Sequence, residues 1–178
     1  MKRVFVAVLF DEPFKDYLEE IQQLLKKSAQ QGKYHLKENF HLTLEFIGNV
    51  EDEKIDTLWQ NIQRAIEGMN RFQLTTTGFH YFMKKNKVIP WIGIEENQQL
   101  LDLQKLILGA VCNSVDHVTE QSYTPHITLG RQVLIETLPK WSGTYTYEVK
   151  EVALMESSSA TGVLRYTPLF RHSLKDYK

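Results

Sequence analysis

The tetrapeptide His41-Leu42-Thr43-Leu44 has a near-copy, His126-Ile127-Thr128-Leu129, placed 85 positions later (126 − 41). Both copies have the order His, aliphatic, Thr, aliphatic. Because side chains alternate between the two faces of a β-strand, each copy puts its aliphatic residues on one face and its His and Thr on the other. The sequence therefore predicts two strands that bury an apolar face and present a His/Thr face to something other than the core.

The residue types on that second face suit phosphate chemistry. A hydroxyl donates a hydrogen bond to a phosphoryl oxygen, and an imidazole exchanges a proton near neutral pH. His41 and His126 are thus candidate acid–base catalysts, with Thr43 and Thr128 as candidate anion-binding residues. A single His on a strand is usually structural, and the repetition is what favours a function. A third His-x-Thr, at 117–119, lies in a polar connector and is interpreted as chance spacing.

The repeat extends beyond the tetrapeptide. A strand at 3–10 and a helix at 13–27 recur, after a shift of 85 residues, as a strand at 88–95 and a helix at 98–112. A polar connector through 31–33 is expected to lead into the first His/Thr strand, which stops at 48–49. The other expected elements are a helix over 51–69, a hairpin of 71–83 and 88–94 around the basic turn 84–87, a second His/Thr strand over 126–133, and strands at 145–155 and 164–174.

This order of elements predicts an α+β fold. We expect two pseudo-symmetric lobes of mainly antiparallel sheet, with helices outside and a central cleft that holds the two H-x-T-x strands. The whole chain, residues 1–178, is expected to form one bilobal domain with an internal repeat of offset 85 (126 − 41).

Composition limits the class of protein. The chain is 42% hydrophobic and 24% charged with a net charge of −1, which argues against a nonspecific nucleic-acid binder but leaves room for a local basic cleft. Its single cysteine, Cys112, cannot form an intrachain disulfide, so the cytoplasm is the expected location. Cys112 ends an apolar helical run and is expected to be buried. We expect no membrane span, no cofactor and a monomer.

The segments 39–48 and 124–131 resemble the paired H-x-T-x motifs of the 2H phosphoesterase superfamily. Within it they are most similar to the bacterial RNA 2',3'-cyclic phosphodiesterases, also called 2'-5' RNA ligases, and residues 3–7 and 165–169 resemble that group as well. The resemblance implies hydrolysis of RNA ends or nucleotides carrying a 2',3'-cyclic phosphate to 2'-phosphate ends, without a metal. It also implies that His41 is the proton donor and His126 the acceptor. Residue chemistry alone does not orient this pair.

Arg131 is a candidate substrate-binding residue with two interpretations open. The family's motif carries an Arg here, which implies charge neutralisation at the phosphate. Strict alternation places Arg131 on the face opposite His126, where it would be a solvated rim charge, unless a bulge at Gly130 turns it round. Lys84, Lys85 and Lys87 are interpreted as a solvated turn rather than as contacts to an RNA backbone, and Phe40 and Tyr123 as packing rather than base-stacking residues.

Three other functions are alternatives to the cyclic phosphodiesterase. A metal protein using His41 and His126 as ligands is disfavoured, since neither has a nearby His or Cys at ligand spacing. A 2'-5' RNA ligase would use the same transition state in reverse, and a non-catalytic protein would only bind RNA ends. If both imidazoles titrate near their reference value of about 6.5, kcat/KM should follow a bell centred near neutrality.

Overall fold

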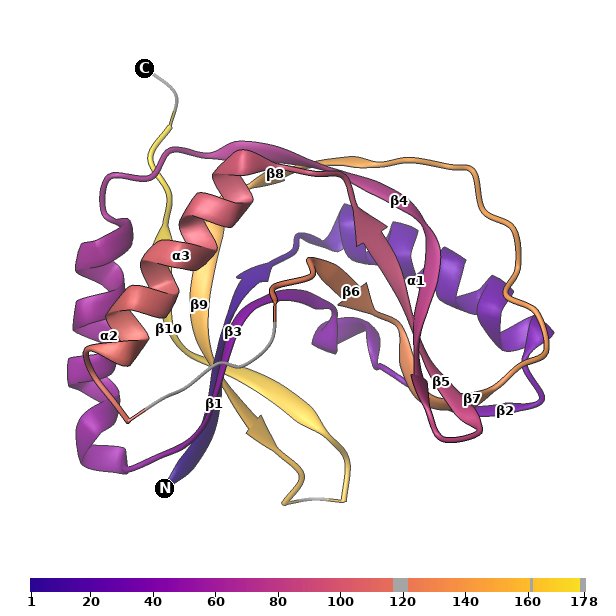
Figure 1. Cartoon of the computed structure of the whole chain (residues 1–178), viewed down its shortest axis with the longest axis horizontal. Coiled ribbons are helices and arrows are strands. Elements are labelled where there is room, and N and C mark those ends of the chain that lie inside the picture. The colour runs from indigo at the N-terminus through magenta and orange to yellow at the C-terminus, as the bar shows by residue number, and fades with distance from the viewer. Residues whose placement is uncertain (117–121, 161, 177–178) are drawn as a thin grey trace.

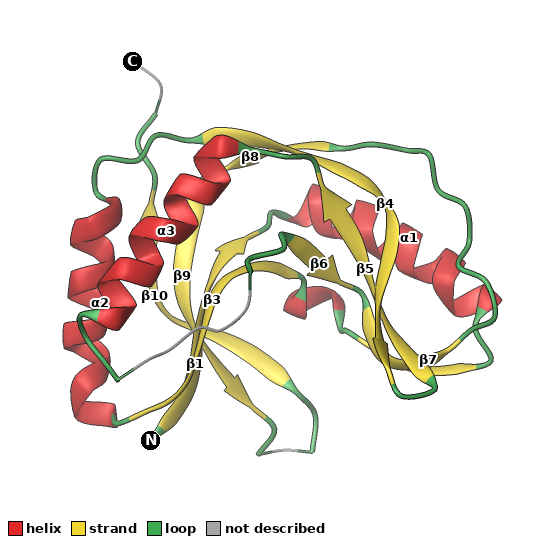
Figure 2. Cartoon of the chain, in the orientation of Figure 1, coloured by secondary structure: helices red, strands yellow, loops and turns green. Residues whose placement is uncertain are grey.

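The computed structural model describes residues 1–116, 122–160 and 162–176. The chain forms two curled sheets, whose strand pairs are all antiparallel in the described ladders, with helices on their outer faces (Figures 1 and 2). The predicted α+β architecture of two lobes with mainly antiparallel sheets is confirmed.

The first sheet has the strand order β10-β9-β1-β3. Its strands are β1 (Lys2–Leu9), β3 (His41–Val50), β9 (Glu151–Ser158) and β10 (Arg165–Ser173). Helices α2 (Asp52–Ile66) and α3 (Gln98–Cys112) pack together beside this sheet, and α3 contacts β3 (Figure 1). The apolar stripe of α2, including Ile55, Leu58 and Ile62, is buried in the core as its spacing predicts.

The second sheet has the order β2-β7-β5-β4-β8, and β6 also pairs with β5. Its strands are β2 (Gln31–Tyr34), β4 (Phe72–Lys84), β5 (Lys87–Ile94), β6 (His126–Thr128), β7 (Gly130–Leu134) and β8 (Thr146–Val149). Helix α1 (Glu12–Ser28) covers this sheet: Phe14 stacks on Tyr147 of β8, and Tyr17 bonds to Thr76 of β4.

Local signals explain where the helices begin. The Asp11 side chain accepts a hydrogen bond from the backbone N of Phe14 at 3.2 Å, with Pro13 in the first turn of α1. In the same way, the Asn97 side chain accepts from the backbone N of Leu100 at 2.9 Å and caps α3. Both caps satisfy backbone donors that have no partner within the helix.

The two halves of the chain exchange their helices. Strand β1 shifted by 85 residues (126 − 41) covers 87–94, which is β5, and α1 shifted likewise overlaps α3. However, α1 packs on the second sheet, where Gln22 donates to the Leu129 carbonyl at 2.8 Å. Helix α3 packs on the first, where Gln104 bonds to Glu45 of β3 at 3.0 Å.

Several boundaries differ from the sequence prediction. The expected polar connector through 31–33 is strand β2, and a short 3-10 helix, η1 (Lys37–Asn39), follows it before β3. The expected strand 145–155 is two strands, because the chain passes from the second sheet to the first at Lys150. The apolar alternation of β8 ends there at two consecutive polar residues, Lys150 and Glu151, and the unbroken apolar run 152–155 of β9 follows, a change of pattern that the sequence prediction did not use. The strand expected over 126–133 is interrupted at Leu129.

Three smaller expectations meet different outcomes. The hairpin of β4 and β5 around residues 84–87 is confirmed. Cys112 was expected to be buried and is exposed, because it lies at the last turn of α3, beyond the buried stripe. The chance-spacing segment at 117–119 lies outside the described residues. Among the residues that are described, no helix has the length and apolar character needed to cross a membrane.

Candidate active site

The two His/Thr strands lie next to each other where the sheets meet. Cα atoms of β3 and β6 come within 8 Å of one another, and Figure 1 shows β6 beside β3. Leu42 and Ile127 are 0% exposed, whereas His41 and His126 are partly exposed. The alternation predicted for both strands is therefore correct. The Tyr123 hydroxyl, just before β6, donates to the backbone carbonyl of Thr43 at 3.0 Å and ties the two strands together.

His41 is held in one orientation. Its Nδ1 lies 2.7 Å from the carbonyl of Asn39, and because a carbonyl only accepts, Nδ1 carries the proton. Its Nε2 lies 3.0 Å from Thr43 Oγ1 and is the nitrogen that gains or loses a proton. Burial lowers the pKa of His41 to about 4; the Asn39 carbonyl partly offsets this, and the charges of His126 and Arg131 add to the lowering.

His126 repeats this arrangement. Its Nδ1 donates to the carbonyl of Thr124 at 2.7 Å, two residues earlier in the chain, as in the first copy. Burial lowers the pKa of His126, the Thr124 carbonyl opposes that shift, and Arg131 adds to it. Both imidazoles are thus neutral near pH 7 with Nε2 as the titrating atom.

Aromatic rings surround both imidazoles. The ring of His41 lies 4.9 Å from Phe5 and 5.0 Å from Tyr166, which meets it edge-on. The ring of His126 lies 5.1 Å from Phe82, again edge-on, and 5.6 Å from Trp91. These apolar neighbours restrict the two imidazoles and exclude water from them, which explains the direction of their pKa shifts.

Arg131 faces the site because the second strand is irregular. Thr128 lies opposite Trp91 and Val133 opposite Val88, so five steps on one strand span three on the other and the two extra residues form a bulge. Arg131 lies in this bulge, and its charge lowers the pKa of both site imidazoles. Of the two interpretations, strict alternation is wrong here.

Gly130 allows strand β2 to lie close to the strand that carries Arg131. It lies opposite Tyr34 of β2, and a Cβ at this position would stand 3.0 Å from the carbonyl O of Lys33 and 3.1 Å from the Tyr34 ring. Without a side chain at Gly130, β2 can pair closely with β7. The adjacent residue, Arg131, is thereby set at the mouth of the site.

A cavity of about 290 Å³ opens beside His41. Its walls include Thr43 and Arg131, together with Arg3, Phe46 and Tyr166, and the Arg3 guanidinium lies 5.0 Å from the Phe46 ring centre. Two arginines and a hydroxyl make this cavity suitable for an anionic group. His126 and Thr128 are not part of its lining; they lie on the β6 side of the junction, where Thr128 shares a face with His126.

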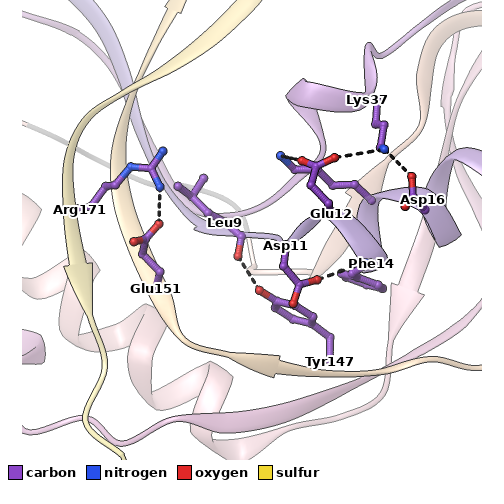
Figure 3. Close-up of polar contacts among 10 residues, drawn as sticks. Leu9, Asp11, Glu12, Phe14, Asp16, Lys37, Tyr147, Glu151 and Arg171 are labelled. Atoms are coloured by element: carbon purple, nitrogen blue, oxygen red, sulfur yellow. Dashed lines mark hydrogen bonds and ion pairs between the residues drawn. The ribbon is translucent and has the colours of Figure 1, made fainter.

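A second cavity, of about 360 Å³, shares His41 and Tyr166 with the first. Its charges are balanced. Arg171 binds Glu151 at 2.7 Å, as Figure 3 shows, and the lining also includes Asp11, Glu38, Lys15 and Lys150. A phosphate would meet repulsion as well as attraction there. The first cavity is the better anion site.

Polar contacts on the second cavity's side hold the start of β3. The Tyr147 hydroxyl donates to the Leu9 carbonyl at 3.0 Å, and Leu9 is the partner of His41 in the β1–β3 ladder (Figure 3). Lys37 in η1 forms an ion pair with Glu12 of α1 at 3.1 Å. These contacts join both sheets and α1 around the first imidazole.

Sequence reasoning missed His35 and the role of Asn39. His35 is 8% exposed, its ring lies 6.0 Å from Tyr166, and neither ring nitrogen has a hydrogen-bond partner among the residues described. Burial lowers the pKa of His35 to about 3, with the charges of His41 and Arg131 contributing. Asn39 binds the Leu164 carbonyl and the Tyr166 N–H with its amide. No periodicity marked either residue, because both lie in the irregular segment before β3.

The described ranges 1–116, 122–160 and 162–176 contain no cluster of side chains arranged to bind a metal ion. No three His, Cys, Asp or Glu side chains gather there as ligands of one ion would. The two site imidazoles have hydroxyl and carbonyl neighbours instead.

Two curled sheets that bring paired His-x-Thr strands to one junction define a phosphoesterase-like architecture. A sequence model of the 2'-5' RNA ligase superfamily matches residues 10–160, and the chain belongs to that superfamily. The RNA 2',3'-cyclic phosphodiesterase of Thermotoga maritima is 32% identical over 133 residues, covering 72% of this chain and 69% of the relative. The enzyme of the same name from Escherichia coli is 31% identical over 148 residues, covering 80% of each.

The fold agrees with these sequence matches. A crystal structure of E. coli LigT complexed with 3'-AMP superposes with a TM-score of 0.83 at 28% sequence identity, covering 97% of this chain and 98% of that one. The resemblance to this family that the motif residues suggested is confirmed.

Proposed function

We propose that this protein is an RNA 2',3'-cyclic phosphodiesterase that converts cyclic phosphate ends to 2'-phosphate ends. The observation that carries the proposal is an arrangement that occurs twice: each imidazole donates a hydrogen bond from Nδ1–H to a carbonyl two residues earlier, which leaves Nε2 to exchange a proton with the substrate. The names of the relatives support the same substrate class. Ligation, the reverse reaction, would need a 5'-hydroxyl RNA end in place of water.

The mechanism follows from the residues on the two strands. Water attacks phosphorus in line with the bond to the ribose O3', and His126 Nε2 takes its proton. The bond from phosphorus to O3' breaks while the proton on His41 Nε2 passes to that oxygen, leaving the phosphate on O2'. Thr43 and Thr128 donate hydrogen bonds to the non-bridging oxygens. Arg131 neutralises the charge that grows on them.

Substrate binding prepares the proton donor. With a pKa of about 4, His41 is mostly neutral in the free protein at pH 7. The phosphodiester carries a negative charge, and an opposite charge nearby raises the pKa of an imidazole. The bound substrate thus favours the protonated His41 that the reaction requires.

The working unit in this proposal is the single chain, residues 1–178, as a monomer in the cytoplasm. The site draws on both sheets, since His41 comes from β3 and His126 from β6, and no second copy is needed to complete it. The cytoplasmic location rests on the single cysteine of the sequence.

The test uses a short RNA that ends in a 2',3'-cyclic phosphate, incubated with the protein in excess EDTA. We expect hydrolysis to a 2'-phosphate end, identified by its resistance to enzymes that act only on 3'-phosphates. His41→Ala and His126→Ala should each lower the rate by roughly 10²–10⁴-fold, the usual contribution of one proton-transfer group. A 3'-phosphate product would contradict the orientation of the pair, and activity that needs added metal would contradict the mechanism.

A further inference from the structure

The sheet face that carries His126 extends well beyond the catalytic residues. In the ladders, Gly93 lies opposite His126, Trp91 opposite Thr128, and His80 opposite Trp91. Residues opposite each other point to the same side of a sheet, as do residues two apart on one strand. His80 and Trp91 therefore share the catalytic face, and so do Phe82, Lys84 and Lys87 further along the β4–β5 hairpin. We call these five residues the hairpin face.

Its rings make a continuous surface that begins at the catalytic imidazole. The Phe82 ring lies 5.1 Å from His126 and 5.0 Å from Trp91, and His80 stacks on Trp91 at 4.5 Å with 18° between the planes. Phe82 is 37% exposed and His80 is exposed, so their outer faces are open. Gly93 lacks a side chain where a Cβ would collide with Thr77 Oγ1 and approach the His80 ring at 3.0 Å.

Beyond the rings the hairpin is basic. Lys84 and Lys87 close the ladder as a facing pair, and Lys85 follows in the turn with a φ of 59°. In the described part of the chain, none of these three lysines has an acidic partner within ion-pair distance. Two positive charges facing each other are unfavourable unless an anion lies between or above them.

The dimensions indicate a polymeric ligand. From Gly93 to Lys87 the strand advances about 20 Å, at roughly 3.3 Å per residue. One stacked nucleotide occupies about 3.4 Å along a strand. If the terminal nucleoside binds in the cavity beside His41, which Phe46 and Arg3 line, the hairpin face on the other side of His126 is available to the rest of the RNA.

We propose that the hairpin face binds the nucleotides on the 5' side of the terminal cyclic phosphate, with bases stacked on Phe82 and His80 and phosphates at Lys84 and Lys87. This rests on the proposed function. Aromatic rings and lysines in one row are the combination that single-stranded RNA binds, because every base has a stacking surface and every linkage a negative charge. The enzyme thus selects oligonucleotides over cyclic mononucleotides.

The kinetic test compares a hexanucleotide ending in a 2',3'-cyclic phosphate with cyclic 2',3'-AMP. We expect Phe82→Leu to lower the ratio of the two kcat/KM values by roughly 5- to 100-fold, the loss of one stacked base. Leucine keeps an apolar contact with Trp91. Tyr81→Ala is the matched control, because Tyr81 is 51% exposed on the same strand but alternates to the opposite face. An unchanged ratio in Phe82→Leu, or an equal fall in Tyr81→Ala, overturns the proposal.

A binding test separates this proposal from the proposed function. The probe is a fluorescein-labelled hexanucleotide with a 3'-phosphate end, which needs no turnover. Lys84→Ala and Lys87→Ala should each reduce the slope of log affinity against log salt by about 0.7, the share of one phosphate contact on a single strand. Lys105→Ala on α3 is the charge-matched control. A wild-type protein that binds the probe with this salt dependence but hydrolyses no cyclic phosphate would refute only the function; unchanged slopes in both lysine variants refute the hairpin face.

Discussion

At the scale of single residues, the two imidazoles differ from free histidine in the same direction. Each donates its Nδ1–H to a backbone carbonyl, and burial and Arg131 act against a second proton on Nε2. A carbonyl partner favours the charged form but does not outweigh burial. The free site therefore holds neutral imidazoles beside the permanent positive charge of Arg131. A bound anionic substrate neutralises this charge and raises the pKa of both imidazoles.

This electrostatic arrangement predicts an acidic pH profile. Since kcat/KM reports the titrations of the free enzyme, we expect a bell with its centre below pH 6.5, lower than the sequence alone suggested. The two apparent values belong to the coupled pair. The profile of kcat should lie at higher pH, because bound substrate raises both pKa values. A kcat/KM optimum above pH 6.5 would contradict the burial argument.

Arg131 supplies a variant that tests the same electrostatics. Arg131→Met removes the positive charge that lowers the pKa of His41 and His126, so the kcat/KM bell should move to higher pH. Its height should fall by on the order of 10²-fold, the loss of one donor to the transition-state oxyanion. Lys27→Met, which removes an exposed charge on α1, should leave the profile in place. If the profiles of Arg131→Met and wild type coincide, Arg131 is a solvated charge at the rim and does not act on the two imidazoles or on the substrate.

At the scale of elements, regular alternation was predictable, whereas the bulge near Gly130 was foreseen only as one of two open interpretations. In β3 and β6 every second residue is apolar, and this alternation predicts which face of each strand is buried. The predicted burial of Leu42 and Ile127 is therefore correct. Strand β2, which pairs closely with Gly130, was not predicted as a strand. Its four residues pair at the sheet edge and show no apolar pattern. Long-range pairing, rather than local preference, forms that strand.

Gly130 gives an element-scale prediction. Gly130→Val should force β2 away from β7, because a Cβ already stands 3.0 Å from the Lys33 carbonyl O, and overpacking of this kind costs about 1–3 kcal/mol in the free energy of unfolding. It should also lower kcat/KM, since Arg131 is the next residue. Gly109→Ala in α3 is the control: nothing lies within 4 Å of its Cβ position, and the helix should gain up to about 1 kcal/mol. Urea titration and turnover are the measurements. Full activity in Gly130→Val would show that the position of Arg131 does not depend on the close pairing of β2 with β7.

At the scale of the whole molecule, the exchange of helices makes the two lobes interdependent. Each half of the sequence repeat provides the helix that covers the other half's sheet, and a single cluster of buried apolar residues includes members of both sheets, such as Val6 and Ile92. This intimate packing also places the irregular segment before β3, with His35, beneath the catalytic junction.

Burial of His35 should make the whole fold sensitive to acid. In the unfolded chain this imidazole takes up a proton near its ordinary pKa of 6.5, whereas in the folded protein its pKa is about 3. Between these values the unfolded state binds more protons, so the free energy of unfolding falls as pH falls from about 6.5 towards 3. By pH 5 the part of this loss due to His35 is about 2 kcal/mol, at roughly 1.4 kcal/mol per pH unit.

His35→Leu removes this group and should retain about 2 kcal/mol of the stability that wild type loses between pH 7 and pH 5. The fall that remains belongs to His41 and other groups with shifted pKa values. Urea titrations at both pH values measure it. The buried nitrogens of His35 have no partner in the described structure, so leucine leaves no hydrogen-bonding group unpaired at this position. Equal losses in variant and wild type would mean that His35 is protonated in the folded protein and that its surroundings accept a charge.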